Sequence, residues 1–217
     1  MSRFDEKTLL LYAVTDRAWT GRQTLLQQIE SALKGGVTLV QLREKNLDFD
    51  EFVDEAVKVK AVCSKYNVPL IINDDIQVAL KSGADGVHVG QEDMKVSDIR
   101  KLVGDSMIIG ATAKTIEQAK KAEAEGADYI GVGAVFPSPT KTNAIRITVD
   151  MLKEICGSVS IPAVAIGGIN KKNMTQITGG GMKGVALVSA IFGAEDIEIE
   201  CEMLKNLAQQ VTFGGKE

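Results

Sequence analysis

One loop of the chain carries side chains that suit phosphate oxygens. Residues 131–135 are apolar and glycine-spaced, as in a buried strand, and two prolines interrupt the segment that follows them. That segment presents Ser138, Thr140 and Lys141. Hydroxyls, backbone amides freed by a turn and one ammonium together form an acceptor for phosphate oxygens. A single loop of this kind is more often an ordinary polar surface loop, so its interpretation depends on which other loops meet it.

Alternating polar residues end the second apolar run of the chain. Gln41, Arg43 and Lys45 are spaced by two, so in a strand they point to one side, opposite Leu42. If that side is the interior of a barrel, its mouth holds one amide and two cations, which suits an anionic substrate. Solvated surface charges explain the same pattern equally well, and the motif alone does not decide between them.

Carboxylates follow the third and fourth apolar runs. The third run ends in Asn73, Asp74 and Asp75, and the fourth leads to Asp93. We expect Asp75 to cap the helix that follows, which leaves Asn73 and Asp74 at the end of the strand. Asp74 and Asp93 would then form a pair of hard oxygen ligands. Mg²⁺ prefers such a site, and it completes its shell with water and phosphate oxygens.

Histidine and cysteine do not indicate a zinc centre. His88 is the only histidine, and no cysteine lies near it in the sequence. We expect His88 to be a hydrogen-bonded residue of the barrel rather than a general base. Its neighbour Gln91 receives no role from the sequence.

Small residues and hydroxyls follow three later runs. Thr112 ends the fifth run, Gly167 and Gly168 follow the seventh, and the eighth leads to Val188 and Ser189. Backbone amides that face inward at such positions, with a helix that opens after Ser189, form a phosphate cup. A tight turn needed only for packing is the alternative explanation for the two glycines.

The polar residues described above are predicted to stand at the carboxyl ends of β-strands. The strands are short apolar runs without alternation, which is typical of strands buried on both faces of a parallel sheet. We predict these strands at residues 9–14, 37–42, 70–72, 86–89, 107–109, 129–132, 163–166 and 185–188. Amphipathic stretches between them predict helices.

Helix start and stop signals agree with this division. Asp48 and Glu51 have the spacing of a capping box. Thr115 and Gln118 repeat that spacing ahead of a later helix. Glycines stand where a left-handed residue would end three of the helices, at Gly35, Gly83 and Gly126.

Alternation of strands and helices, repeated about eight times, predicts a single-domain (β/α)₈ TIM barrel of the α/β class. Segments 83–90 and 126–133 share one pattern of helix end, turn and strand, which supports a repeated unit. An open doubly wound sheet is the alternative, but residues 15–19 after the first strand are not the glycine-rich turn it needs. We expect one domain over residues 1–217, with an ordered core at about 8–210 and a short frayed tail.

Composition excludes several functional classes. The chain has 217 residues, 45% of them hydrophobic and 25% charged, and a net charge of −4. This charge argues against general nucleic-acid binding, and no apolar run is long enough to span a bilayer. Cys63, Cys156 and Cys201 are far apart and odd in number, which predicts a reducing cytoplasm rather than a disulfide framework. A homo-oligomer is left open.

In their order and spacing, the motifs resemble those of the thiamine-phosphate synthase family, also called thiamin phosphate pyrophosphorylase. The resemblance runs from Tyr12 to about Phe192. It rests on Gln41-x-Arg43-x-Lys45, Asn73-Asp74, His88-x-Gly90-Gln91-x-Asp93, the loop at 136–141, Ile166-Gly167-Gly168-Ile169 and Val188-Ser189. The family is a (β/α)₈ barrel that joins a hydroxymethylpyrimidine diphosphate to a thiazole phosphate, releasing pyrophosphate and forming thiamine phosphate.

The resemblance also implies roles for individual residues. The pyrimidine diphosphate would be held by Gln41, Arg43, Lys45, Asn73 and Lys141. Mg²⁺ would be bound by Asp74 and Asp93. The thiazole phosphate would be contacted by Thr140, Gly168, Val188 and Ser189. Catalysis would consist of stabilising the departing pyrophosphate, through Arg43, Lys45 and Lys141.

Three positions depart from the family pattern. Ser138 stands where threonine is common, Thr112 where serine is common, and Ala134 where proline is common. The first two keep a hydroxyl, so they remain candidate substrate-binding residues. We expect the loop to be a flap that bridges both substrates, with Lys141 toward the diphosphate and Thr140 toward the thiazole phosphate.

Three other functions compete with the synthase. A related thiazole tautomerase would lack the pyrophosphate machinery, and the retention of Arg43, Lys45, Lys141 and the aspartate pair argues against it. A sugar-phosphate epimerase or isomerase would need paired acid and base groups, which fit the residues less well. A non-catalytic sensor of phosphorylated ligands would bind the same groups without turnover.

Overall fold

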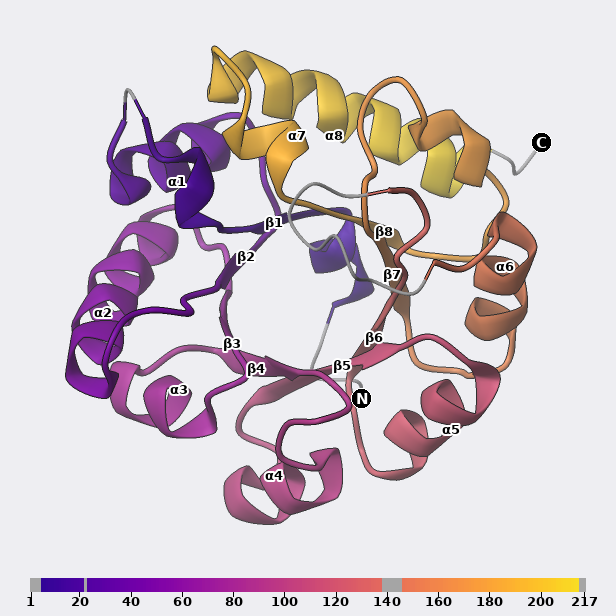
Figure 1. The fold of residues 1–217 in the computed structure, drawn as a ribbon, viewed down its shortest axis with the longest axis horizontal. Helices are drawn as coiled ribbons and strands as arrows, with labels where there is room; N and C mark the ends of the chain where they lie inside the picture. The colour runs from indigo at the N-terminus through magenta and orange to yellow at the C-terminus, as the bar shows by residue number, and fades with distance from the viewer. Residues whose placement is uncertain (1–4, 22, 138–145, 215–217) are drawn as a thin grey trace.

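Eight parallel strands close into a barrel, with helices around the outside (Figure 1). The computed structural model describes residues 5–21, 23–137 and 146–214. The strands are β1 (Leu11–Val14), β2 (Leu39–Leu42), β3 (Leu70–Asn73), β4 (Gly86–Val89), β5 (Ile108–Ala113), β6 (Tyr129–Val132), β7 (Ala163–Ile166) and β8 (Gly184–Leu187). Each strand pairs with its sequence neighbours, and β8 pairs with β1 to close the ring. The predicted (β/α)₈ barrel is therefore confirmed.

Helices connect the strands on the outer face. They are α1 (Leu25–Lys34), α2 (Phe49–Lys65), α3 (Ile76–Ser82), α4 (Val96–Val103), α5 (Ile116–Ala124), α6 (Val149–Gly157), α7 (Ser189–Phe192) and α8 (Ile197–Phe213). Short 3₁₀ helices are η1 (Glu6–Leu9), η2 (Arg17–Trp19) and η3 (Met174–Ile177), of which η3 lies between β7 and β8. None of the helices in the described ranges is long and apolar enough to cross a membrane.

Three predicted strands, at 86–89, 129–132 and 163–166, have the predicted bounds, and others shift. Leu9, expected to start the first strand, belongs instead to η1, which Asp5 caps. β2 starts at Leu39 rather than Val37, since the Thr38 hydroxyl binds the backbone of the first strand before the ladder begins. β5 extends to Ala113, because its small residues pair with β6 although they show no apolar pattern.

The capping signals were mostly correct. Asp48 and Glu51 form the predicted reciprocal capping box. The Thr115 hydroxyl accepts from the backbone of Gln118, but the Gln118 side chain accepts from the N–H of Lys114 instead, so that box is half formed. Gly83 adopts the left-handed conformation, with φ of 70°.

The expected left-handed cap at Gly35 was wrong. Its φ is −72°, and the next residue, Gly36, takes the positive value of 90°. A Cβ at Gly35 would collide with the carbonyl oxygen of Glu198 and with Cys201, so close packing of α1 on α8 explains the glycine there. Gly126 does take a positive φ of 93°, one residue after the C-cap Glu125.

The barrel interior is largely apolar, and polar residues gather at the carboxyl ends of the strands. Inward-facing side chains form one cluster, made of Leu9, Tyr12, Val14, Leu39, Ile71, Tyr129, Val164 and Ala186. A second and larger core fills the space between the strands and the surrounding helices. Register aligns Asn73 with His88 and Val14 with Gln41, which brings polar residues from different strands to the same end.

Candidate active site

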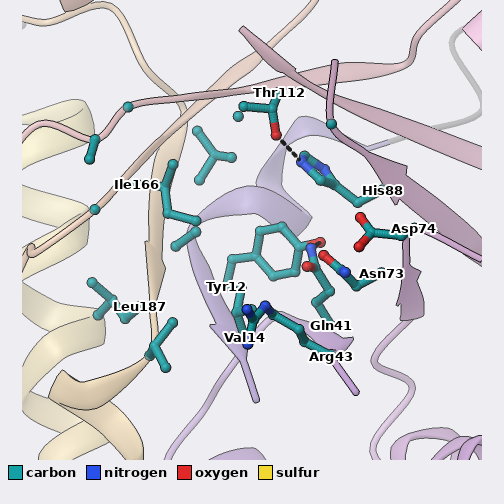
Figure 2. Close-up of a pocket in the computed structure, with 18 of the residues that line it drawn as sticks. Tyr12, Val14, Gln41, Arg43, Asn73, Asp74, His88, Thr112, Ile166 and Leu187 are labelled. Atoms are coloured by element: carbon teal, nitrogen blue, oxygen red, sulfur yellow. Dashed lines mark hydrogen bonds between the residues drawn. The ribbon is translucent and has the colours of Figure 1, made fainter. Parts of the chain in front are cut away.

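The carboxyl ends of the strands surround a cavity of about 440 Å³. Figure 2 shows side chains from several strands directed toward it. The predicted site residues that line it are Gln41, Arg43, Lys45, Asn73, Asp74, Asp93, Thr112, Gly168, Val188 and Ser189. The remaining predictions, Ser138, Thr140 and Lys141, lie outside the described residues. Residues predicted from six different strands therefore meet at one end of the barrel.

The end of β2 supplies an amide and a guanidinium. Gln41 is buried, and its Nε2 donates to the hydroxyl of Tyr12 at 2.6 Å. The backbone N–H of Arg43 donates to Thr15 Oγ1 at 2.9 Å, and Nη1 of Arg43 lies 3.3 Å from Asp16 Oδ2. The alternation inferred from the sequence is correct, because Gln41, Arg43 and Lys45 all face the cavity.

Lys45, Asp74 and Asp93 form a charged cluster beside these groups. Lys45 Nζ donates to Asp74 Oδ2 at 2.6 Å, and Asp93 Oδ2 accepts from the N–H of Gly90 at 2.7 Å. Burial opposes ionisation of Asp74, but its hydrogen bonds with Lys45 and Asp93 outweigh burial and lower its pKa. Burial and the nearby charge of Asp74 raise the pKa of Asp93. The carboxyl groups of Asp74 and Asp93 are therefore hydrogen-bonded neighbours, and charge on Asp74 opposes charge on Asp93.

The backbone of Asp74 is held in an unusual conformation. Its φ is 66°, a left-handed value that is uncommon for a residue other than glycine. The N–H of Asp74 donates to the carbonyl oxygen of His88 at 2.8 Å, which holds the turn against β4. The next residue, Asp75, caps α3 as predicted, accepting from the N–H groups of Gln77 and Val78. The turn therefore leaves the Asp74 carboxylate at the cavity while Asp75 serves the helix.

His88 is a hydrogen-bonded residue of the barrel interior, as the sequence predicted. Its Nδ1 lies 3.0 Å from the Tyr129 hydroxyl and its Nε2 lies 3.0 Å from Thr112 Oγ1. Burial lowers the pKa of His88 to about 4, so the ring is neutral near pH 7. Burial also raises the pKa of Tyr129 and of Tyr12, so both hydroxyls stay protonated.

Two glycines after β7 are required by the close approach of the segment after β6. Gly167 and Gly168 have φ values of 100° and 64°. A Cβ at Gly168 would collide with the carbonyl oxygens of Phe136 and Pro137, and Phe136 N–H donates to the carbonyl oxygen of Gly167 at 2.9 Å. Packing therefore explains both glycines. α7 begins at Ser189 itself, with Val188 as its N-cap, rather than after Ser189 as expected.

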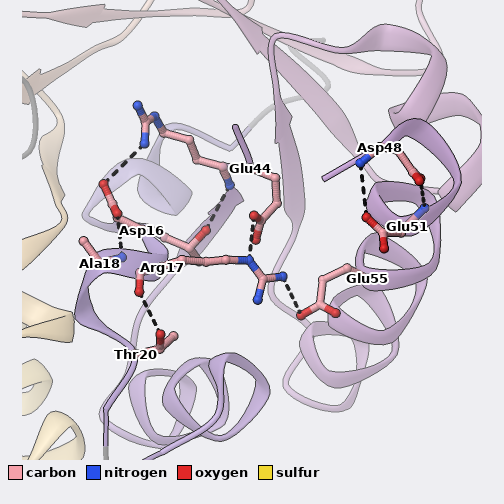
Figure 3. Close-up of polar contacts among 10 residues, drawn as sticks. Asp16, Arg17, Ala18, Thr20, Glu44, Asp48, Glu51 and Glu55 are labelled. Atoms are coloured by element: carbon pink, nitrogen blue, oxygen red, sulfur yellow. Dashed lines mark hydrogen bonds and ion pairs between the residues drawn. The ribbon is translucent and has the colours of Figure 1, made fainter. Parts of the chain in front are cut away.

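Sequence reasoning missed an ion-pair network that borders the site (Figure 3). Arg17 Nε lies 2.7 Å from Glu44 Oε2, and its Nη2 lies 3.6 Å from Glu55 Oε1. The hydrogen bond to Glu44 raises the pKa of Arg17. Asp16 thus pairs with Arg43, and the next residue along the chain, Arg17, pairs with Glu44, the residue after Arg43. The alternating charges at residues 43–45 indicate ion pairs in the sequence, but only the tertiary structure shows which residues are their partners.

Sequence reasoning also missed the two tyrosines beneath the cavity. Tyr12 and Tyr129 stand in strongly apolar runs, and both are essentially fully buried. A tyrosine buried in a strand needs a partner for its hydroxyl, and that requirement was the available signal.

Comparisons with known proteins agree on one family. Residues 11–191 match the family model described as thiamine monophosphate synthase. A thiamine-phosphate synthase of Clostridium tetani is 46% identical over 89% of this chain and 93% of its own length. The corresponding figures for one of Ruminiclostridium cellulolyticum are 48%, 89% and 92%.

One solved structure agrees with this family, and another shares only the fold. A thiamine phosphate pyrophosphorylase of Pyrococcus furiosus superposes with a TM-score of 0.86 and 36% identity, covering 95% of this chain and 98% of its own. An N-acetylmannosamine-6-phosphate 2-epimerase of Clostridium perfringens superposes with a TM-score of 0.64 at 16% identity, covering 88% and 92%, and shares the fold alone.

Proposed function

Because the chain belongs to the thiamine monophosphate synthase family, we propose that the mouth of its barrel carries out the reaction of that family. The reaction is that of thiamine-phosphate synthase, a transferase of thiamine biosynthesis. The C–O bond between a pyrimidinylmethyl group and its diphosphate breaks, and pyrophosphate leaves with the electron pair. The ring nitrogen of a thiazole phosphate then bonds to the methylene carbon, which forms thiamine phosphate. The observation that carries the proposal is that the family motifs converge on one cavity.

Charge stabilisation of the leaving pyrophosphate is the proposed work of Arg43 and Lys45, with Lys141 from the loop. Arg43 and Lys45 both line the cavity and lie on the same side of the end of β2. A charge pair about 4 Å apart is worth about 4 kcal/mol at an effective dielectric constant near 20. The cations are held by Asp16 and Asp74, so they are positioned before the diphosphate arrives. Positioned charge of this kind lowers a barrier without reorganisation during the reaction.

We propose that Asp74 and Asp93 hold Mg²⁺. Hard carboxylate oxygens suit this ion, and a divalent cation would offset both the burial of Asp93 and its contact with the charge of Asp74, which together raise the pKa of Asp93. The described ranges contain no cluster of three or more histidine, cysteine, aspartate or glutamate residues suited to a metal. Two protein ligands would leave the other positions to water and diphosphate oxygens. When bound, Mg²⁺ supplies charge neutralisation at the leaving group.

The remaining polar residues are proposed to position the two substrates. Gln41 and Asn73 lie beside the cations, which supports a role with the pyrimidine diphosphate. Gly168, Val188 and Ser189 line the cavity farther along the barrel, which supports a role with the thiazole phosphate, together with Thr140 of the loop. Thr112 lines the cavity too, and with Ser138 it would supply hydroxyl contacts. When both substrates are bound in the reacting geometry, the bond-forming step no longer depends on a random encounter between them.

Release of pyrophosphate from a mixture of both substrates tests the proposal. We expect pyrophosphate and thiamine phosphate to form in equal amounts, and only when both substrates are present. A thiazole tautomerase would convert its thiazole without the pyrimidine, and a sensor would bind both without turnover. Either outcome would overturn the synthase proposal.

The same assay tests the metal. We expect chelation by EDTA to abolish pyrophosphate release and added Mg²⁺ to restore it, because the leaving diphosphate would otherwise face two unscreened carboxylates. Full activity in the chelator would remove Mg²⁺ from the proposal.

A reducing cytoplasm is the proposed location. Cys63, Cys156 and Cys201, all within the described residues, are buried free thiols. Burial raises the pKa of each thiol, so none is poised to react with an oxidant.

A further inference from the structure

Five side chains form an unbroken line of hydrogen bonds across the barrel, beneath the cavity. Gln41 Nε2 donates to the Tyr12 hydroxyl at 2.6 Å, and the Tyr12 and Tyr129 hydroxyls lie 2.8 Å apart. The Tyr129 hydroxyl lies 3.0 Å from His88 Nδ1. On the other side of the ring, His88 Nε2 lies 3.0 Å from Thr112 Oγ1, the contact drawn in Figure 2. The line begins and ends at residues that border the cavity.

The barrel is shaped around the middle of this line. A Cβ at Gly110 would collide with the ring and hydroxyl of Tyr129, and a Cβ at Gly131 would come within 3.2 Å of His88 Cε1. The rings of Tyr12 and Tyr129 meet edge to face, with centroids 6.0 Å apart. β5 and β6 thus carry glycines where the rings of Tyr129 and His88 pack against them. This close packing leaves the two rings little freedom to turn.

One assignment of hydrogens satisfies every group along this line. Because Gln41 Nε2 donates to Tyr12, the single hydrogen of the Tyr12 hydroxyl is available for Tyr129. The Tyr129 hydroxyl can then donate to Nδ1 of His88, which leaves the proton of the ring on Nε2, facing Thr112. Each ring nitrogen of His88 faces a hydroxyl oxygen at 3.0 Å, so a neutral ring accepts through one nitrogen and donates through the other.

The two ends consequently present opposite groups to the cavity. Within the described part of the chain, the carbonyl oxygen of Gln41 has no hydrogen-bond partner, so it is available as an acceptor. Thr112 accepts from His88, so its own hydrogen is available as a donor. A reversed line would turn the NH₂ group of Gln41 toward the cavity instead.

We propose that Tyr12, Tyr129 and His88 are positioning residues that hold the Gln41 amide with its carbonyl oxygen toward the substrate. This inference rests on the proposed function, in which Gln41 holds the pyrimidine diphosphate, and it adds that the Gln41 amide meets the exocyclic amino group of the pyrimidine. The exocyclic amino group is a donor and needs an acceptor, whereas a pyrimidine with an oxo group there needs a donor. The buried hydrogen-bond line therefore favours the substrate with the amino group over the one with the oxo group, although Tyr12, Tyr129 and His88 act on it only through Gln41.

The experiment compares two pyrimidine diphosphates, one with the exocyclic amino group and one with an oxo group in its place. For each, kcat/KM is measured by pyrophosphate release with thiazole phosphate and Mg²⁺ present. In Tyr129→Phe the Tyr12 hydroxyl loses its acceptor, so its hydrogen turns to Gln41 and the amide flips. We expect the amino-over-oxo ratio to fall by about tenfold or more relative to wild type, the factor that corresponds to about 1.4 kcal/mol. Intrinsic reactivity of the two substrates cancels in this comparison.

Tyr66→Phe is the matched control. The Tyr66 hydroxyl contacts Glu30 at 3.4 Å, away from the cavity, so we expect its ratio to equal that of wild type. If Tyr129→Phe fails to fold, as judged by thermal unfolding, Tyr12→Phe removes the acceptor of Gln41 and is expected to lower the ratio in the same way.

The outcomes separate this inference from the function on which it rests. If a folded variant loses activity toward both substrates equally, the ratio stays constant and the tyrosines only fill space, which overturns the inference alone. If wild type releases no pyrophosphate from the amino substrate, the proposed function itself fails.

Discussion

Each of the two described cations proposed for the leaving group stands against a carboxylate. Arg43 contacts Asp16 at 3.3 Å and Lys45 contacts Asp74 at 2.6 Å. An incoming diphosphate therefore competes with these carboxylates for the same donors. The exchange keeps the cations in place, but it makes their net contribution smaller than that of unpaired charges.

Substitution of Lys45 tests this balance. We expect Lys45→Ala to lower kcat by about 10²-fold, since a single positioned charge at a leaving group is worth about 3–4 kcal/mol. Steady-state kinetics with both substrates measures the effect. Lys101→Ala is the control, because Lys101 forms a comparable pair with Asp98, at 3.0 Å, on the exposed side of α4. Equal activity of the two variants would exclude Lys45 from the leaving-group role.

At the scale of the elements, one polar contact recurs in alternate strand–helix units. The Asp85 carboxylate accepts from the N–H of Leu70 and pairs with Lys60 of α2. Two strand–helix units later, the Asp128 carboxylate accepts from the N–H of Ile109. In both segments that share the repeated pattern, 83–90 and 126–133, this aspartate ties the preceding strand to the start of the next, which explains the repeat as a structural one.

Arg100 of α4 completes the second of these contacts. Its Nη2 lies 2.6 Å from Asp128 Oδ2, and its guanidinium also donates to the carbonyl oxygen of Gly126. We expect Arg100→Ala to lower the free energy of unfolding by about 2 kcal/mol, because several charge-assisted hydrogen bonds are lost together. Urea unfolding measures the change. The kcat of the folded variant should equal that of wild type, and a loss of kcat without a loss of stability would contradict this structural role.

At the scale of the whole molecule, closure of the barrel places a neutral histidine in its centre. Leu11 pairs with Val185 to join the first strand to the last, and His88 is enclosed by the ring that results. Burial outweighs the attraction of Asp74 and lowers the pKa of His88 to about 4. The imidazole of His88 must therefore be buried in its neutral form for the barrel to close.

This burial predicts a pH dependence of stability. The unfolded chain protonates His88 near pH 6.5, and the folded chain does so only near pH 4. The stabilisation is present above pH 6.5 and is lost as the pH falls toward 4. Between pH 7 and pH 5 we expect the free energy of unfolding to fall by about 2 kcal/mol more in wild type than in His88→Gln. Carboxylates titrate in both proteins, so the difference isolates His88, and an equal fall in urea unfolding would refute its neutral burial.

Local patterns were enough for the barrel and for the polar residues at the ends of its strands. Apolar runs and caps depend on neighbours in the chain, so the strands, the capping box at Asp48 and the polar strand ends could all be predicted. The line through Tyr12, Tyr129 and His88 could not, because the two tyrosine hydroxyls that meet at 2.8 Å are 117 residues apart in the sequence. The ion pairs of Arg43 and Lys45 and the tight packing at Gly35 likewise arise between distant segments. Only closure of the ring brings such residues into contact, and it thereby decides which way each polar group faces.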